Sequence, residues 1–228
     1  MIPIPGSGLS SPARTREDGR DTLAVFDLDG TLIHGDSFLP FLFSYAQRTR
    51  RLWPVATIPV YAGLYAAKMM SDRDAKERLI QAFFRDQPRS RIDDHADWFC
   101  ESWVRPRLRE NTVARLRKHQ SAGHRVILLS ASPDLFVPRI GRYLGIGETV
   151  CTRVRYHDGV CSGRLAGPNC KGPNKVTLLR EHLGLDRAPE RSHAYGDSTS
   201  DLPILRWVEE GYLLRKQEFV RVRAVECA

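Results

Sequence analysis

The stretch AVFDLDGTLIHGD, residues 24–36, decides the fold. It contains the end of a short apolar run, LAVF at residues 23–26, which predicts a buried strand. Two aspartates, Asp27 and Asp29, follow this run, and the DGT sequence that comes next is typical of a turn. Like charges this close together repel each other unless a positive group lies between them. The stretch therefore predicts a strand that delivers two carboxylates to a site with a positive partner.

The rest of the chain divides into a helical part and an alternating part. Helical patterns fill residues 37–110, and the prolines at 54, 59, 88 and 106 separate them into several helices. After them, strands are predicted at 125–130, 192–197 and 211–214, and helices at 110–123, 133–145, 175–184 and 200–210. We also expect a β-hairpin, in which 149–156 and 160–167 flank the turn residues at 157–159. Alternating strands and helices predict an α/β fold, with a parallel sheet covered on both faces.

Polar side chains end three of these predicted strands. Asp27 and Asp29 follow the first, Ser130 ends the strand at 125–130, and Asp197 ends the strand at 192–197. Ligands of such sheets bind beyond the carboxyl ends of the strands. If the three strands are neighbours, these side chains converge at one place.

The chemistry of these side chains points to a metal and a phosphate. A second acidic pair, Asp197 and Asp201, matches the pair at the first strand. Clustered carboxylate oxygens suit a hard divalent cation, above all Mg²⁺, which also prefers a phosphate oxygen as a ligand. A carboxylate can attack phosphorus to form an acyl phosphate, and a second one can act as acid and base. Ser130 with the amides of its turn can supply donors to the phosphate, and Lys171 and Lys175 can supply positive charge.

Each piece has an ordinary alternative when it is taken alone. A single D-x-D is more often a solvated turn, and a serine after an apolar strand is usually a helix cap. Lys175 alone is typical of a surface residue, and Asp201 alone is typical of a helix N-terminus. The ordered set is far more specific than any of its members.

That set resembles the motifs of the haloacid dehalogenase superfamily. DLDGTL at 27–32 resembles its first motif and ILLS at 127–130 its second. Lys175 in GPNKV resembles the third, and GDSTSD at 196–201 the fourth. The resemblance covers residues 23 to about 215. It implies a Rossmann-like three-layer α/β/α core, residues 21–36 and 111–228, with a helical cap at 37–110.

The resemblance also implies roles for individual residues. Asp27 would be the nucleophile and Asp29 the general acid and base, with Thr31 bracing the turn. Asp27, the backbone carbonyl of Asp29 and Asp197 would hold Mg²⁺, while Asp201 would support the metal or orient Lys175. Ser130, Ala131 and Lys175 would bind the phosphoryl group. Haloacid dehalogenases proper lack the second acid, so Asp29 favours phosphate chemistry.

The helical insertion is similar to that of the phosphoserine-phosphatase branch, subfamily IB. LLSASPDLF at 128–136 fits that branch, and Asp36 stands where phosphoserine phosphatases have a glutamate that reads the substrate's amino group. The rest of their cap signature is missing, which leaves phosphoserine itself in doubt. Asp36 is therefore a candidate for substrate specificity.

Residues 52–67, LWPVATIPVYAGLYAA, carry no charge and have Arg48, Arg50 and Arg51 before them and Lys68 after them. A bilayer span needs about 20 apolar residues, so this run is too short for one. It is either a cap helix in the core or in a homodimer interface, or an interfacial helix on anionic lipid. Phosphatidylglycerophosphatase C proteins resemble this chain in having an apolar stretch here.

Composition limits the partners and the compartment. The net charge of +8 favours anionic partners, although no compact basic-aromatic motif indicates nucleic acid. The odd cysteine count of five and the lack of C-x-x-C fit a reducing compartment, so we expect a cytoplasmic protein, peripheral at the inner membrane face if it binds lipid. Residues 1–20 are expected to form a flexible tail. Surface or helix-face positions, without a functional role, are expected for His95, His119, His124, His182 and His193.

These observations predict a Mg²⁺-dependent phosphatase that hydrolyses a small phosphorylated metabolite through an aspartyl phosphate. A phosphatase acting on a membrane lipid phosphate is the alternative. A phosphomutase and a degenerate, non-catalytic binding protein are further hypotheses. The binding-protein hypothesis is disfavoured because every motif position that carries chemistry has a suitable residue: Asp27, Asp29, Ser130, Lys175, Asp197 and Asp201.

Overall fold

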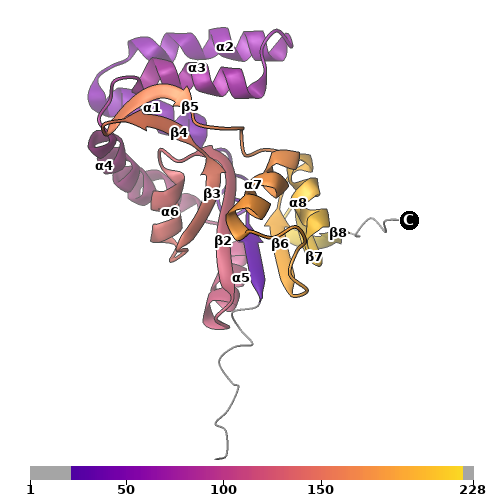
Figure 1. The fold of residues 1–228 in the computed structure, drawn as a ribbon. Helices are drawn as coiled ribbons and strands as arrows, with labels where there is room; N and C mark the ends of the chain where they lie inside the picture. The colour runs from indigo at the N-terminus through magenta and orange to yellow at the C-terminus, as the bar shows by residue number, and fades with distance from the viewer. Residues whose placement is uncertain (1–21, 223–228) are drawn as a thin grey trace, which may run out of the picture.

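The computed structural model describes residues 22–222, so the tail predicted at 1–20 and Cys227 lie outside the described residues. A sheet of six strands forms its centre, in the order β3-β2-β1-β6-β7-β8 (Figure 1). The strands are β1 (Leu23–Phe26), β2 (Arg125–Pro133), β3 (Glu148–Thr152), β6 (Ser192–Gly196), β7 (Glu210–Arg215) and β8 (Glu218–Val222). β8 pairs antiparallel with β7 and all other pairs in this sheet are parallel. The predicted α/β class is confirmed.

Each face of the sheet carries its own apolar core, because successive side chains of a strand point to opposite faces. Ala24 and Phe26 belong to one core, and Leu23 and Val25 to the other. Four helices complete these layers: α5 (Glu110–Ser121), α6 (Val137–Tyr143), α7 (Pro173–Leu183) and α8 (Leu202–Trp207). α5 and α6 supply side chains to the first core, and α7 and α8 to the second.

The segment predicted as a cap is helical, and Figure 1 shows much of it beyond one end of the sheet. It contains α1 (Phe38–Thr49), η1 (Trp53–Ala56), α2 (Thr57–Ala66), α3 (Asp72–Phe84), α4 (Arg89–Phe99), η2 (Cys100–Val104) and η3 (Arg105–Arg107). The apolar run at 52–67 is thus divided between η1 and α2. No helix within residues 22–222 is long and apolar enough to cross a bilayer.

The predicted hairpin is present as β4 (Val154–His157) and β5 (Val160–Leu165), but it belongs with the cap rather than with the central sheet. Its turn residues Asp158 and Gly159 both have positive φ. Asp86 N donates to Cys161 O, and Cys161 N donates to Gln87 O, so β5 is tied to the chain that follows α3. The structure therefore splits the run 149–156, with β3 in the main sheet and β4 in the hairpin.

The start of one helix and the presence of one strand differ from the prediction. Pro133 was expected in the first turn of a helix, but it ends β2, and the helix α6 begins at Val137 with Pro138 in its first turn. Pro138 fits there because a first-turn residue needs no intrahelical N–H bond. The edge strand β8 was missed, since its pattern EFVRV alternates over too few residues to stand out.

Two of the histidines expected at surface or helix-face positions, His95 on α4 and His119 on α5, lie on helix faces that are buried. His95 is 4% exposed, and His119 is 8% exposed with its Nε2 2.9 Å from the Tyr195 hydroxyl. Burial lowers the pKa of each to about 4, below the ordinary value of 6.5. Each therefore stays neutral inside the fold at neutral pH.

These pKa values predict that the two buried histidines stabilise the fold less in acid than at neutral pH. Between pH 6.5 and about 4 each of these imidazoles binds a proton in the unfolded chain but not in the folded one, so its contribution to the free energy of unfolding falls as pH falls through this range. The slope is at most about 1.4 kcal/mol per pH unit for each histidine. Urea unfolding at pH 7 and pH 5, for the wild type and for His119→Gln, measures this contribution. The change in the free energy of unfolding from pH 7 to pH 5 should be less unfavourable in His119→Gln than in the wild type, and an identical change in both proteins would contradict this account.

Candidate active site

The strand register brings together the side chains that the sequence placed at strand ends. β1 lies between β2 and β6, with Phe26 opposite both Leu128 and Tyr195. Asp27 follows β1 directly and its backbone N–H donates to Tyr195 O over 2.9 Å. Asp197 follows β6 in the same way. The convergence of Asp27 and Asp197 is a consequence of parallel pairing between β1 and β6.

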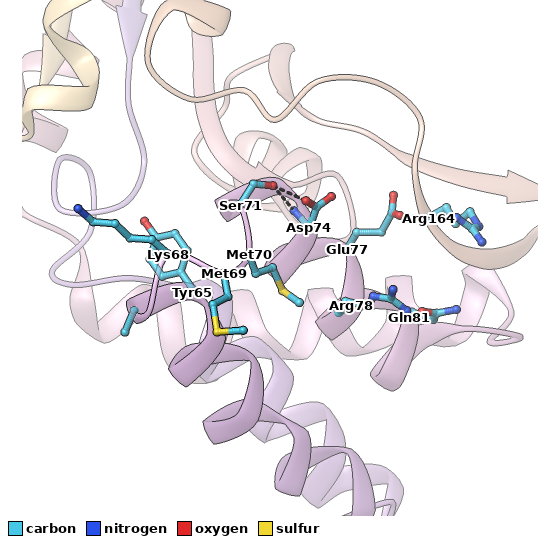
Figure 2. A pocket seen from close by; sticks show the side chains of 11 residues that line it. Tyr65, Lys68, Met69, Met70, Ser71, Asp74, Glu77, Arg78, Gln81 and Arg164 are labelled. Atoms are coloured by element: carbon cyan, nitrogen blue, oxygen red, sulfur yellow. Dashed lines mark hydrogen bonds and ion pairs between the residues drawn. The ribbon is translucent and has the colours of Figure 1, made fainter.

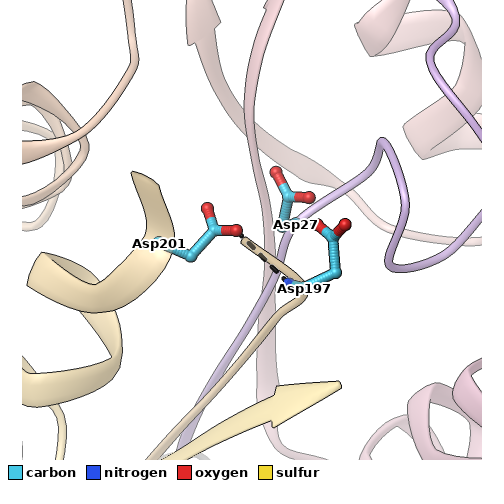
Figure 3. A group of neighbouring side chains, drawn as sticks. All are labelled: Asp27, Asp197 and Asp201. Carbon is cyan, nitrogen blue, oxygen red and sulfur yellow. Dashed lines mark hydrogen bonds between the residues drawn. The ribbon is translucent and has the colours of Figure 1, made fainter. Parts of the chain in front are cut away.

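Three carboxylates form a cluster at this edge of the sheet: Asp27, Asp197 and Asp201 each offer an oxygen, and these oxygens lie within 4.8 Å of one another (Figure 3). Asp201 comes from η4 (Thr199–Asp201), where its Oδ2 accepts from the backbone N–H and the hydroxyl of Ser198. Thr31 Oγ1 lies 3.1 Å from Asp27 Oδ2 and 3.3 Å from Asp197 Oδ1, so one hydroxyl contacts two of the three carboxylates. The donor set, carboxylate oxygens only, fits a hard cation such as Mg²⁺.

Lys175 is the positive partner that the sequence predicted for these carboxylates. It comes from the first turn of α7, it is 2% exposed, and its Nζ lies 2.6 Å from both Asp27 Oδ1 and Asp201 Oδ1. Burial alone would lower the pKa of this ammonium, but the two carboxylates raise it instead, so Lys175 is charged. One ammonium faces the three carboxylates of the cluster, which leaves room for further positive charge.

The pKa values of the three carboxyl groups in the cluster are shifted in different directions by this environment. Burial, which outweighs the attraction of Lys175, raises the pKa of Asp27 to about 8. Burial also raises the pKa of Asp197, and neighbouring Asp201 raises it further. Burial would raise the pKa of Asp201 as well, but Lys175 and the Ser198 donors leave it lowered.

Asp29 is held apart from the cluster by two donors. Ser37 N donates to its Oδ1 over 2.7 Å, and Ser132 Oγ donates to its Oδ2 over 2.6 Å. Burial, followed by the nearby charge of Asp36, raises the pKa of Asp29 to about 6. Asp36 itself accepts a hydrogen bond from Phe38 N over 2.9 Å. The side chain of Asp29 is thus fixed in place, and its carboxylate is not one of the three clustered ones.

The phosphate-binding residues predicted on β2 lie at its carboxyl end. Ser130 is fully buried, and its Oγ accepts from Ser132 N over 3.0 Å. Ala131 lines the cleft, and its carbonyl accepts from Lys76 Nζ over 2.7 Å. Lys171, the alternative to Lys175, is exposed and pairs with Asp72 on α3 over 3.1 Å.

A cleft of about 880 Å³ opens above these groups, between the sheet edge and the helices α1, α2 and α3. Its floor carries Asp27, Asp29, Asp197 and Lys175. Its opposite wall is largely apolar and comes from the cap: Phe38, Leu39, Ile58, Tyr61, Ala62, Tyr65 and Leu79. The site is therefore polar where the carboxylates lie and apolar where a bound molecule would extend away from them.

Three residues of this site were not predicted from the sequence. Ser132 was detectable, because it lies two residues after Ser130 on a strand and thus on the same face. Ser37 acts through its backbone N–H, which has no sequence signal. Lys76 lies among the charged residues of α3, yet it reaches over to Ala131 and to Asn169 Oδ1, 2.7 Å away, and burial lowers its pKa.

Gly30 is needed for the close approach of the β1 turn to Asp197. Its φ is +77°, and a Cβ there would lie 2.1 Å from Asp197 Oδ2. Gly30→Ala should displace that carboxylate and lower the catalytic rate by about 100-fold, because misplacement by about 1 Å has such effects. Gly35→Ala is the matched control, with a φ of +82° and no atom within 4 Å of the added Cβ.

The control should show only the cost of a left-handed alanine, about 1–2 kcal/mol in the free energy of unfolding. Initial rates and urea unfolding curves for both variants test this prediction. Equal losses of rate in the two variants would mean that backbone strain, and not contact with Asp197, explains the requirement for Gly30.

Known proteins with similar sequences and folds agree with the family that the sequence motifs resemble. The family model of haloacid dehalogenase-like hydrolases matches residues 24–206. Protein CicA of Caulobacter vibrioides is 34% identical over 210 residues, covering 90% of this chain and 92% of its own. Phosphoserine phosphatase SerB1 of Mycobacterium tuberculosis is 27% identical over 194 residues, covering 81% and 62%.

Among solved structures, a protein of unknown function from Bordetella pertussis Tohama I superimposes with a TM-score of 0.70 and 25% identity, covering 82% of this chain and 86% of its own. The motif resemblance is therefore confirmed over most of the chain. From its fold, its strand-end carboxylates and these relatives, the chain belongs to the haloacid dehalogenase-like hydrolase family.

Proposed function

We propose that the protein is a Mg²⁺-dependent phosphatase that hydrolyses a phosphomonoester by way of an aspartyl phosphate on Asp27. The arrangement around Lys175 carries this proposal. The ammonium of Lys175 lies 2.6 Å from both Asp27 Oδ1 and Asp201 Oδ1. It therefore fixes Oδ1 of Asp27, while the other oxygen, Oδ2, lies beside Thr31. Such a carboxylate, at the floor of a cleft and beside further oxygen donors, is placed to meet a phosphoryl group.

In the first step an Asp27 oxygen forms a bond to phosphorus while the bond between phosphorus and the ester oxygen breaks. The protonated carboxyl of Asp29 gives its proton to the departing alkoxide. In the second step the Asp29 carboxylate takes a proton from water, the water oxygen bonds to phosphorus, and the bond to Asp27 breaks. Inorganic phosphate leaves, and both aspartates return to their starting states. The two donors that fix Asp29, Ser37 N and Ser132 Oγ, support this double role.

The residues that would hold Mg²⁺ are Asp27, Asp197 and the carbonyl of Asp29, with Asp201 in support. When bound, the ion supplies positive charge to the phosphoryl oxygens. Ser130, Ala131 and Lys175 contribute the protein's own contacts to that group. The charge of the cluster, three carboxylates against one ammonium, supports the same assignment.

The substrate we favour is a small phosphorylated metabolite, with Asp36 and Lys76 at the cap side of the cleft to read its polar groups. A second candidate, the phosphate of a membrane lipid, has one observation in its favour. The cleft wall opposite the carboxylates contains Ile58, Tyr61 and Leu79, which suit an apolar leaving group.

Phosphate release from a panel tests both candidates. The panel contains phosphoserine, sugar and nucleoside monophosphates, histidinol phosphate, and phosphatidylglycerol phosphate in mixed micelles, each with Mg²⁺ or with EDTA. Release that requires Mg²⁺ supports the proposal, and the best substrate decides between the two classes. No release from any member would favour a mutase or a binding protein.

A further inference from the structure

The helix α2 leaves much of its apolar surface uncovered. No residue of α2 is buried, although the helix consists almost wholly of apolar and small residues. Five of the eleven large hydrophobic side chains exposed within residues 22–222 lie between residues 52 and 69, in α2 or in the chain on either side of it: Leu52, Trp53, Val60, Tyr65 and Met69. Trp53 is 61% exposed, Val60 57% and Met69 76%. Patches of this kind on a single segment mark an interaction surface.

The charge around this segment has one sign. From Ser37 to Ser71 the chain contains no aspartate or glutamate, but it contains Arg48, Arg50, Arg51 and Lys68. Arg48 stacks on Trp98 with its Cζ 4.4 Å from the ring centroid. The surface is therefore apolar in the middle and basic at both ends, which is the pattern of a helix that lies in a lipid headgroup layer.

The position of α2 in the molecule suits such contact. Figure 1 shows α2 and α3 at the extreme end of the molecule, with α2 outermost. Beyond the end of α2, Lys68 and Met69 lie at the edge of a groove of about 770 Å³, whose other side carries Asp74, Glu77 and Arg164 (Figure 2).

The acidic side chains of α3 do not offer a partner to a second copy of α2. Asp74 and Glu77 lie near Arg73, and Glu77 also lies near Arg164, each within ion-pair distance in the same chain. A symmetric dimer through α2 would oppose two basic segments with no acid between them. An anionic lipid surface can accommodate the exposed apolar side chains of this segment and also attract its basic side chains.

We propose that residues 50–69, with α2 at their centre, dock on an anionic lipid surface. Val60 and Trp53 enter the headgroup layer, while Arg50, Arg51 and Lys68 contact lipid phosphates. The inner side of α2, through Ile58 and Tyr61, lines the cleft, so docking brings the cleft close to the lipid surface. The proposal does not depend on the substrate of the active site.

Sedimentation of the full chain with vesicles tests the docking. One set of vesicles is phosphatidylcholine, and the other contains about a third phosphatidylglycerol, which gives a negative surface. We expect binding to the second set only. Val60→Asp should lower it by about tenfold or more, because a charge enters the apolar face. The matched control is Val220→Asp, at a valine on β8 that is 52% exposed, and this variant should bind as the wild type does.

A second variant, Arg50→Glu with Arg51→Glu, tests the basic contribution and should also lower binding by about tenfold or more. Thermal melting of each variant controls for folding, and hydrolysis of a soluble phosphate by Val60→Asp should match the wild type. The proposal fails if the wild type ignores anionic vesicles, binds neutral ones equally, or retains binding in Val60→Asp. It also fails if gel filtration shows a dimer that Val60→Asp dissolves, which would assign the surface to a second copy.

Discussion

Asp27→Asn is expected to abolish turnover and leave the protein folded. The amide cannot attack phosphorus, and the loss of a nucleophile costs on the order of 10⁴-fold or more in kcat. The fold should tolerate the change, because the asparagine side chain keeps the shape of aspartate and can still accept from Thr31. Lys175 also keeps a carboxylate partner after the change, because its Nζ lies 2.6 Å from Asp201 Oδ1.

Two measurements make this prediction specific to the nucleophile. Rapid acid quenching of the wild type with a labelled substrate should trap an acyl phosphate that hydroxylamine cleaves, and Asp27→Asn should trap none. Asp29→Asn should form the intermediate slowly and hydrolyse it slowly, because the acid and base of both steps is lost. Turnover that survives in Asp27→Asn would show that the nucleophile is another residue.

The sequence was sufficient for the parts of the structure that depend on local patterns. LAVF predicted β1 with correct bounds, and Asp158-Gly159 predicted the hairpin turn, since few other residues adopt positive φ. The convergence of Asp27 and Asp197 could be predicted because it requires only that β1 and β6 are neighbouring parallel strands, as they are in the structure.

Other features depend on tertiary contacts and left no local signal. The hairpin packs on α3 because Gly163 allows β5 to approach the Gln81 backbone, where a Cβ would lie 2.9 Å from its Cα. Lys76 was missed for a similar reason, because its partners Ala131 and Asn169 are far away in sequence. His95 and His119 were expected on the surface or on a helix face, and their burial follows from aromatic neighbours contributed by other elements.

Lys175→Met should both inactivate and destabilise the protein. Methionine keeps the stem of the side chain and removes the ammonium that lies 2.6 Å from Asp27 and Asp201. Removal of one partner from a buried ion pair costs about 3–5 kcal/mol, because the remaining charge is left unpaired. Urea unfolding and phosphate release measure the two effects.

Lys171→Met is the matched control, since Lys171 lies four residues away and pairs with Asp72 while its side chain is 42% exposed. An exposed pair is worth at most about 1 kcal/mol, so this variant should keep most of its stability. If Lys175→Met kept wild-type activity and Lys171→Met lost it, the phosphate-binding role would move to Lys171.

A double variant separates the effect of charge from that of packing. If Lys175 acts by neutralising buried carboxylates, Asp201→Asn should be far less harmful in the Lys175→Met background than alone, because the unpaired charge is then gone. The loss of stability in the double variant should fall short of the sum of the two single losses by about 1–3 kcal/mol. Strict additivity would mean that Lys175 stabilises the protein through its methylene stem, and that the ammonium serves the phosphoryl group alone.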